Sequence, residues 1–260
     1  MFDRSVRSVF DEAAEAYDIA RPGYPSELID RLIELTRLPA NARILEIGCG
    51  TGQITVPLAE CGYEIVAIEL GENLAAVAAR NLSGFPHARV IHSTLEEWRC
   101  DEPAFDLVVS AQAFHWLDPV IGYPKIRQLL QHSGHLAVIY NLFSGGDDLV
   151  YRDLESAYRR HSPQRDENDA LRRLQETVER TVCAISDCRL FHEPVVWEHD
   201  WIEIYTADRY MKLLETFSDH RSLPEPNRTH LFRDIRRIID KHGGSIDRPL
   251  QATLFLSRVL

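Results

Sequence analysis

Residues 43–52 read RILEIGCGTG, and this stretch decides the fold. Its apolar start is typical of a buried strand, and three glycines in alternate positions follow, at 48, 50 and 52. A glycine turn between a strand and a helix lets a ligand come close to the backbone. The next apolar run, 63–70, carries Glu69 near its end, where a carboxylate can accept hydrogen bonds from ribose hydroxyls. The stretch therefore predicts a strand, a binding turn and a helix within an α/β sheet.

Strands and helices alternate on both sides of this turn. From the apolar spacing, strands are expected at 42–47, 63–70, 89–93, 105–110 and 135–141, and helices at 25–38, 53–61, 72–82 and 125–131. This alternation predicts a parallel, doubly wound sheet. After Asn141 two charged helical stretches, 149–161 and 166–182, interrupt it. Further strands are expected at 195–204 and 251–260, with helices at 207–217 and 228–244.

Composition limits the class of partner. Asp and Glu outnumber Lys and Arg by 40 to 29, a formal charge of −11, which disfavours nucleic acid because its phosphates must be neutralised. The N-terminus lacks the apolar core of a signal peptide, and no apolar run is long enough to span a membrane. We therefore expect a soluble, cytoplasmic protein, a monomer or homodimer, with a small-molecule partner.

Five scattered cysteines suit unpaired thiols in a reducing compartment. Cys183 and Cys188 have a spacing possible for half of a zinc site, but no second pair follows, so no metal is expected.

The spacing of the glycines bears on the cofactor. A dinucleotide fingerprint, Gly-x-Gly-x-x-Gly, counted from Gly48 requires a third glycine where this chain has Gln53. An NAD-dependent oxidoreductase is therefore disfavoured. The pattern from Glu46 to Gly52 instead resembles the first motif, E/D-x-G-x-G-x-G, of the class I S-adenosylmethionine-dependent methyltransferases.

This resemblance implies a fold and a cofactor. The fold is a seven-stranded, mostly parallel Rossmann-like sheet with helices on both faces and a helical insertion or cap, and the cofactor is S-adenosyl-L-methionine. It implies one domain, with cap helices at 1–40, a cofactor-binding core at 41–144, a helical insertion over the site at 145–191 and C-terminal strands and helices at 192–260. The cofactor-binding residues that it implies are Tyr17, Arg21, Glu46, Gly48, Cys49, Gly50, Glu69, Leu70, Thr94, Leu95 and Ser110.

Two further stretches, FDEAAEAYDIARPGYP at 10–25 and AQAFHW at 111–116, resemble a small-molecule subgroup that includes trans-aconitate methyltransferases. The subgroup resemblance implies that Tyr17 and Arg21 lie near the sulfonium and the methionine carboxylate. The aromatic candidates for holding the methyl cation are Tyr17, Phe114 and Trp116, although Phe114 is equally expected in the core. His115, just beyond the fourth strand, is a candidate to deprotonate an acceptor or to orient one.

Methyl transfer from a sulfonium needs alignment and exclusion of water, with neither metal nor covalent intermediate. The subgroup resemblance favours O-methylation of a carboxylate, which is ionised near neutral pH and needs no base. A hydroxyl, amine or carbon acceptor in specialised metabolism stays open, as does a non-catalytic cofactor-binding protein. A nucleic-acid amino-methyltransferase is disfavoured, because the loop after the fourth strand reads SAQA.

Several parts of the chain are candidates to select the acceptor. These are Tyr140, Asn141, the 145–191 insertion, the stretch 216–223 and, for a polycarboxylate, Arg21, Arg209 and Arg221.

Overall fold

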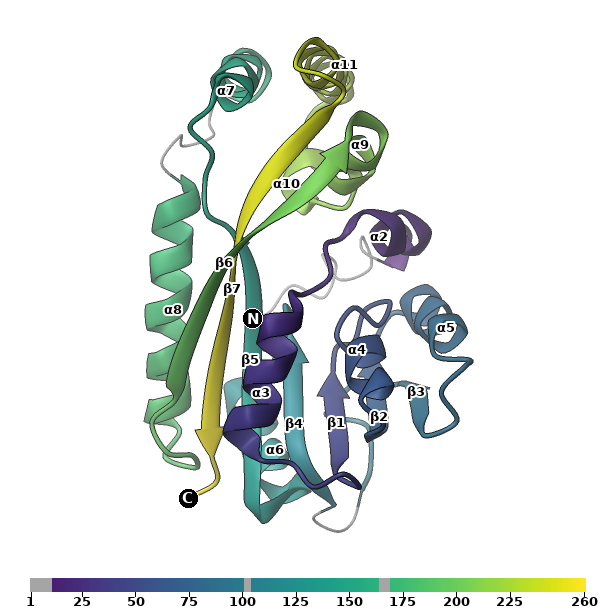
Figure 1. Cartoon of the computed structure of the whole chain (residues 1–260), viewed down its shortest axis with the longest axis vertical. Helices are drawn as coiled ribbons and strands as arrows, with labels where there is room; N and C mark the ends of the chain where they lie inside the picture. The colour runs from purple at the N-terminus through teal and green to yellow at the C-terminus, as the bar shows by residue number, and fades with distance from the viewer. Residues whose placement is uncertain (1–10, 101–103, 164–168) are drawn as a thin grey trace.

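Among the residues that the structure describes, seven strands form one sheet in the order β3-β2-β1-β4-β5-β7-β6 (Figure 1). This computed structural model describes residues 11–100, 104–163 and 169–260. Every strand expected from the sequence is present. The strands are β1 (Arg43–Ile47), β2 (Glu64–Glu69), β3 (Ala88–His92), β4 (Phe105–Ala111), β5 (Leu130–Phe143), β6 (Val195–Thr206) and β7 (Ser245–Arg258).

The sheet is mixed, which corrects the expectation of a mostly parallel sheet. β1 to β5 pair in parallel, but β7 pairs antiparallel with both β5 and β6. A parallel neighbour requires a crossover that carries the chain back along the sheet. After β6 the chain instead forms α9 (Ala207–Glu215), α10 (Ser218–Arg221) and α11 (Glu225–Lys241), which lie beyond the end at which β6 finishes (Figure 1). β7 therefore enters the sheet from that same end and must run antiparallel.

Helices cover both faces of the sheet. One face carries α3 (Ser26–Thr36), α4 (Thr55–Glu60) and α5 (Glu72–Asn81), and the other carries the short 3-10 helix η1 (Phe114–Trp116), α6 (Pro119–Leu129) and α8 (Asp169–Asp187). Successive side chains of a strand point to opposite faces, so each central strand serves both layers. In β1, for example, Ile44 packs into the cluster with α3 and α4, whereas Leu45 packs into the cluster with α6 and α8.

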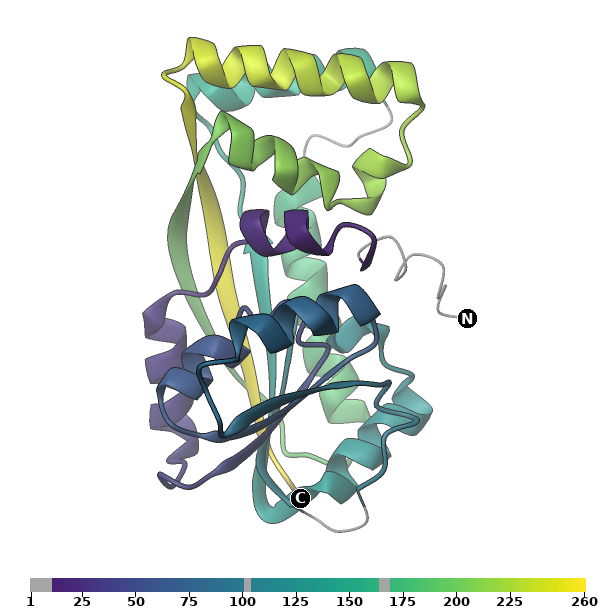
Figure 2. The same cartoon turned by 90° about the vertical axis from the view of Figure 1, so that its right-hand side faces the viewer.

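A cap stands at the carboxyl ends of the parallel strands and consists of α7 (Leu149–His161), α9, α10 and α11 (Figure 1). It has its own apolar cluster, in which α7, α9 and α11 bury residues such as Leu154, Leu213 and Ile235. α2 (Ala14–Ala20) lies between the cap and α5 (Figure 2). The stretch expected as one insertion thus divides, since α7 belongs to the cap while α8 lies against the sheet (Figure 1).

Within the described ranges, no helix is long and apolar enough to cross a membrane. The same part of the chain holds no group of three or more His, Cys, Asp or Glu side chains placed to bind a metal ion.

Candidate active site

The turn after β1 places all three of its glycines in the left-handed region. Their φ angles are +73° at Gly48, +57° at Gly50 and +98° at Gly52. A Cβ on Gly48 would lie 2.5 Å from the Cβ of Ala113. A Cβ on Gly50 would lie 3.4 Å from Cε1 of Tyr17. Backbone conformation therefore disfavours a side chain at all three positions, and at Gly48 the lack of space excludes one as well. The turn presents bare backbone to whatever lies over it.

Glu69, at the end of β2, is bound to the backbone on both of its carboxylate oxygens. Oε2 accepts a hydrogen bond from the N–H of Gly50 at 2.8 Å, and Oε1 accepts one from the N–H of Gly71 at 2.8 Å. Burial raises the pKa of the Glu69 carboxyl, while these two N–H groups act in the opposite direction. Each oxygen keeps a further lone pair, so the fixed carboxylate can also accept hydrogen bonds from a vicinal diol.

Glu46 lies inside β1 with only 1% of its surface exposed. Its Oε2 accepts a hydrogen bond from the hydroxyl of Thr55 at 2.6 Å. Burial raises the pKa of the Glu46 carboxyl to about 8, with the Thr55 hydrogen bond opposing and nearby Glu69 adding to the rise. A cation brought to this carboxyl would favour its ionised form.

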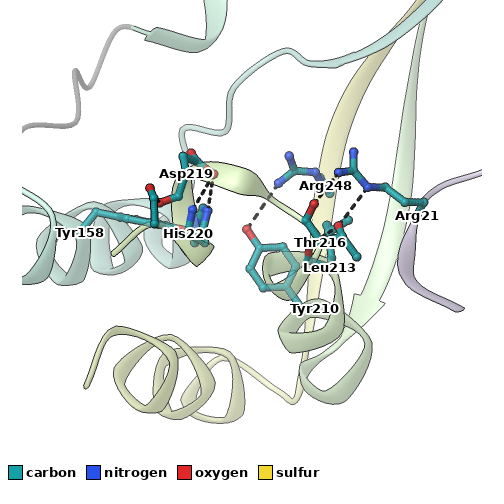
Figure 3. Close-up of polar contacts among 9 residues, drawn as sticks. Arg21, Tyr158, Tyr210, Leu213, Thr216, Asp219, His220 and Arg248 are labelled. Atoms are coloured by element: carbon teal, nitrogen blue, oxygen red, sulfur yellow. Dashed lines mark hydrogen bonds and ion pairs between the residues drawn. The ribbon is translucent and has the colours of Figure 1, made fainter. Parts of the chain in front are cut away.

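Tyr17 in α2 and Arg21 directly after it connect the glycine turn with the cap. Burial raises the pKa of Tyr17, the ring over Gly50. The guanidinium of Arg21 lies 5.0 Å from the Tyr17 ring centre and 4.6 Å from that of Phe217. It also donates to the hydroxyl of Thr216 at 2.9 Å and to its carbonyl at 3.0 Å (Figure 3). Arg21 therefore holds α2 against the segment between α9 and α10.

The loop after β4 carries three residues predicted for the site, and they point to different surroundings. Phe114 is buried and stacks on Tyr123 at 5.1 Å, so it belongs to the core. His115 is exposed, and its ring centre lies 4.9 Å from that of Trp116 and 6.0 Å from that of Tyr140. His115 and Trp116 both face the cavity described next.

One cavity of about 1530 Å³ extends from the glycine turn to the cap. It brings together most of the residues predicted from the sequence. Those that line it are Tyr17, Arg21, Glu46, Gly48, Cys49, Gly50, Glu69, Leu70, Thr94, Leu95, His115 and Trp116. Ser110 does not line it, because its side chain is fully buried and donates to the carbonyl of Ile47 at 3.0 Å. We call the part around the turn and Glu69 the turn half, and the part beside α7, α10 and β7 the cap half.

The acceptor-selecting candidates divide between this cavity and other surfaces. Asn141 lines the cavity, whereas Tyr140 is buried beside it. Arg209 pairs with Glu203, and Arg221 pairs with Glu12 at 2.9 Å, both away from the cavity lining.

Arg248 lines the cap half and was missed by the sequence analysis. Its guanidinium lies 4.4 Å from the ring centre of Phe143 and donates to the hydroxyl of Tyr210 at 3.4 Å (Figure 3). Among the described residues, no carboxylate forms an ion pair with it. The final strand was expected at 251–260, whereas β7 begins at Ser245 and so includes Arg248. No pattern in the sequence marked Arg248 as a cavity residue.

The comparisons with known proteins agree with this geometry. Residues 44–134 match the family described as Methyltransferase domain. An uncharacterized methyltransferase of Mycobacterium tuberculosis is 36% identical over 140 residues, which are 53% of this chain and 54% of that protein. A malonyl-[acyl-carrier protein] O-methyltransferase of Geobacter sulfurreducens is 29% identical over 161 residues, 60% of this chain and 58% of that protein. The chain thus spans little more than half the length of the curated relatives that it matches.

A solved structure from Anaeromyxobacter dehalogenans, described as a candidate type II methyltransferase, shares the fold with a TM-score of 0.66. It is 23% identical and covers 92% of this chain and 96% of its own. The segment 44–134 therefore matches a methyltransferase domain by sequence, and the chain shares the fold of that solved structure. The narrower resemblance to trans-aconitate methyltransferases stays a prediction.

Proposed function

We propose that this protein transfers a methyl group from S-adenosylmethionine to a small molecule, and that the accepting atom is a carboxylate oxygen. The observation that carries the methyltransferase assignment is the turn half of the cavity. There the bare glycine backbone, the fixed Glu69 carboxylate and the buried Glu46 carboxyl lie side by side.

These residues fit S-adenosylmethionine chemically. Glu69 would accept the ribose hydroxyls, and Leu70, Thr94 and Leu95 supply an adjacent wall for the adenine. Glu46 would gain its charge beside the cofactor's cationic end, while Tyr17 and Trp116 offer aromatic faces to a cation. When bound, S-adenosylmethionine supplies an activated methyl group. The task of the protein is then to align the acceptor and to exclude water, and the position of the cavity between sheet, α2 and cap suits this.

The cap half supports an anionic acceptor. The protein carries a formal charge of −11, yet the guanidinium groups of Arg21 and Arg248 both line this cavity. Arg21 and Arg248 lie 4.6 Å and 5.9 Å from the ring centre of Phe217. A planar guanidinium can bind a carboxylate through two parallel hydrogen bonds. An ionised carboxylate is itself a nucleophile, so this reaction needs orientation, by His115 among others, but no protein base.

Two measurements test the proposal. In calorimetry we expect S-adenosylhomocysteine to bind and NAD to show no heat. A screen of small carboxylic acids, phenols and amines with isotopically labelled cofactor, read by mass, should then identify an acceptor that gains one methyl group. Binding of NAD without binding of S-adenosylhomocysteine would overturn the assignment, and a methylated amine as the sole product would overturn the carboxylate.

A further inference from the structure

We propose that Asp219, His220 and Tyr158 form a proton-accepting relay in the cap half, which gives the enzyme a second activity, the methylation of hydroxyl groups on small anionic acceptors. This inference rests on the proposed methyltransferase function and adds an acceptor that needs a base. His220 is on α10 and Tyr158 on α7, and all three side chains line the same cavity as the glycine turn.

The hydrogen bonds of the relay fix its direction. Nδ1 of His220 lies 2.8 Å from Oδ1 of Asp219, and Nε2 lies 2.8 Å from the hydroxyl of Tyr158 (Figure 3). A carboxylate can only accept, so the ring proton belongs on Nδ1 and Nε2 accepts the Tyr158 hydroxyl proton. Asp219 accepts from the backbone N–H of His220 as well, at 2.8 Å. The carboxylate thereby orients the imidazole, and the imidazole in turn makes the phenol oxygen a stronger proton acceptor.

The three side chains of the relay differ in burial. His220 is 6% exposed and Tyr158 9%, whereas 60% of the Asp219 side chain is exposed. Aromatic rings surround the imidazole, with Phe217 at 5.6 Å and Phe232 at 6.2 Å between ring centres. The proton-accepting nitrogen is thus held in a buried, fixed position, and the exposed carboxylate connects the ring to solvent.

A row of contacts leads from the glycine turn to this relay. Tyr17 lies over Gly50, Arg21 lies between the rings of Tyr17 and Phe217, and Phe217 packs on His220. Arg248 also lies near this ring, at 5.9 Å from the ring centre of Phe217. An acceptor in the cap half would therefore meet a guanidinium and a proton acceptor on neighbouring walls. The acceptor class that fits both is a small hydroxy acid.

The reaction balances without any added reagent. The hydroxyl oxygen of the acceptor forms a bond to the methyl carbon as the bond from that carbon to sulfur breaks, which leaves S-adenosylhomocysteine. The hydroxyl proton passes to the oxygen of Tyr158, and the proton of Tyr158 passes to Nε2 of His220. The resulting imidazolium is stabilised by Asp219 and later loses its proton to solvent. General-base assistance of this kind contributes about 10²- to 10⁴-fold to a rate.

The test compares hydroxyl acceptors that need a base with acceptors that do not. Hydroxybenzoates and hydroxyphenylacetates are paired with nitro-substituted counterparts whose hydroxyl is already ionised. Mild alkali distinguishes the products, because a methyl ester is hydrolysed and an aryl methyl ether is not. We expect the wild type to form ethers. His220→Gln and Tyr158→Phe should lower kcat/KM for the un-ionised hydroxyls by roughly 10²-fold or more, but for the ionised hydroxyls by less than about tenfold.

His230→Gln, a change of the same type at an exposed position on α11, is the matched control and should alter neither rate. Equal losses for both kinds of acceptor in His220→Gln and Tyr158→Phe would reduce the relay to a structural contact between α7 and α10 and overturn the inference. So would ester as the only product of the wild type. Failure of the wild type to bind S-adenosylhomocysteine would instead overturn the proposed function itself, which keeps the two outcomes distinct.

Discussion

The two halves of the cavity are assembled in different ways. The turn half depends mainly on consecutive residues, because Gly48, Gly50 and Gly52 form one turn and Glu69 ends the neighbouring strand. The cap half depends on residues from α7, α10 and β7, such as Tyr158, which are far apart in the sequence. A site encoded by local backbone conformation should fail abruptly on substitution. A site built from separate elements should respond in smaller steps.

The largest effect is expected from Gly50→Val. At φ +57° a β-branched residue is strained, and its Cβ would lie 3.4 Å from both Tyr17 and Gln53. We expect S-adenosylhomocysteine binding to become undetectable by calorimetry, because the side chain occupies the space above the turn. Gly62→Val is the control for backbone strain alone, because Gly62 also has a positive φ, +88°, but nothing lies within 4 Å of its added Cβ. A loss of binding in Gly50→Val but not in Gly62→Val would therefore come from the blocked site. If both variants bind normally while folded, the ligand lies elsewhere.

Glu69→Ala should weaken S-adenosylhomocysteine binding by about 1.5 to 3 kcal/mol, the range for hydrogen bonds to a charged group. The variant loses the proposed ribose acceptor and also releases the N–H groups of Gly50 and Gly71. Glu64→Ala, at the exposed start of the same strand, is the control and should bind as the wild type does. An unchanged affinity in Glu69→Ala would remove the carboxylate from the site.

The fold was largely predictable because the local spacing of apolar residues indicates where strands and helices form. The apolar runs of β1 to β4 and the helical spacing of α3, α5 and α7 fall within two residues of their observed positions, whereas β5 begins five residues before the expected start. The antiparallel direction of β7 was not predictable in this way. It follows from where α9 to α11 lie, and no local pattern encodes the side of the sheet from which a chain returns.

The same division applies to the site. The glycines and Glu69 could be identified because their spacing is typical of a binding turn between a strand and a helix. Arg248 could not, because it becomes a cavity residue only when the cap packs over the sheet ends. His220 lies in the candidate stretch 216–223, but no local pattern in the sequence indicated its hydrogen bond to Tyr158. Arg209 and Arg221 show the converse, since their type suited a carboxylate but their positions pair them with Glu203 and Glu12.

The pH dependence of binding tests the buried carboxyl of the turn half. The pKa of Glu46 is raised to about 8, so near neutral pH this group is mainly protonated before the ligand binds. A cationic ligand beside it would release that proton, and affinity should rise with pH up to about 8, by at most roughly tenfold per pH unit. Calorimetry in two buffers of different ionisation enthalpy measures the proton directly. Equal heats in both buffers would argue against a cation at Glu46.

The same carboxyl has an effect on stability with a defined sign. Because the pKa of Glu46 is raised in the folded state, the protonated carboxyl contributes to the free energy of unfolding. This contribution is fully present below the unfolded-state pKa near 4.5 and is lost as pH rises toward 8. Glu46→Gln keeps an acceptor for Thr55 but cannot ionise. The variant should therefore gain stability relative to the wild type between pH 5 and pH 8, in denaturant unfolding of the ligand-free protein.

His115 should show a smaller effect, because it positions the acceptor rather than removing its proton. With a carboxylate acceptor, His115→Gln keeps a hydrogen-bond donor and should retain most of kcat/KM. His115→Ala should lose roughly ten- to a hundredfold, the effect of one hydrogen bond to a charged group. A near-total loss in His115→Gln, with a rate that rises tenfold per pH unit through neutrality, would identify His115 as a general base instead.

The smallest effect concerns the cap. The stretch 145–191 was predicted to act as part of a lid, and α7 lines the cavity through Tyr151, Leu154 and Tyr158, whereas the end of α8 packs Ile185 against the sheet. Lids become ordered on ligand binding and exchange their amide hydrogens more slowly. We expect S-adenosylhomocysteine together with an acceptor to slow exchange about threefold in α7, and to leave 177–187 unchanged. Equal slowing in both segments would mean that the whole stretch moves as one lid, and no slowing in either would mean that the cap half is already formed before ligands arrive.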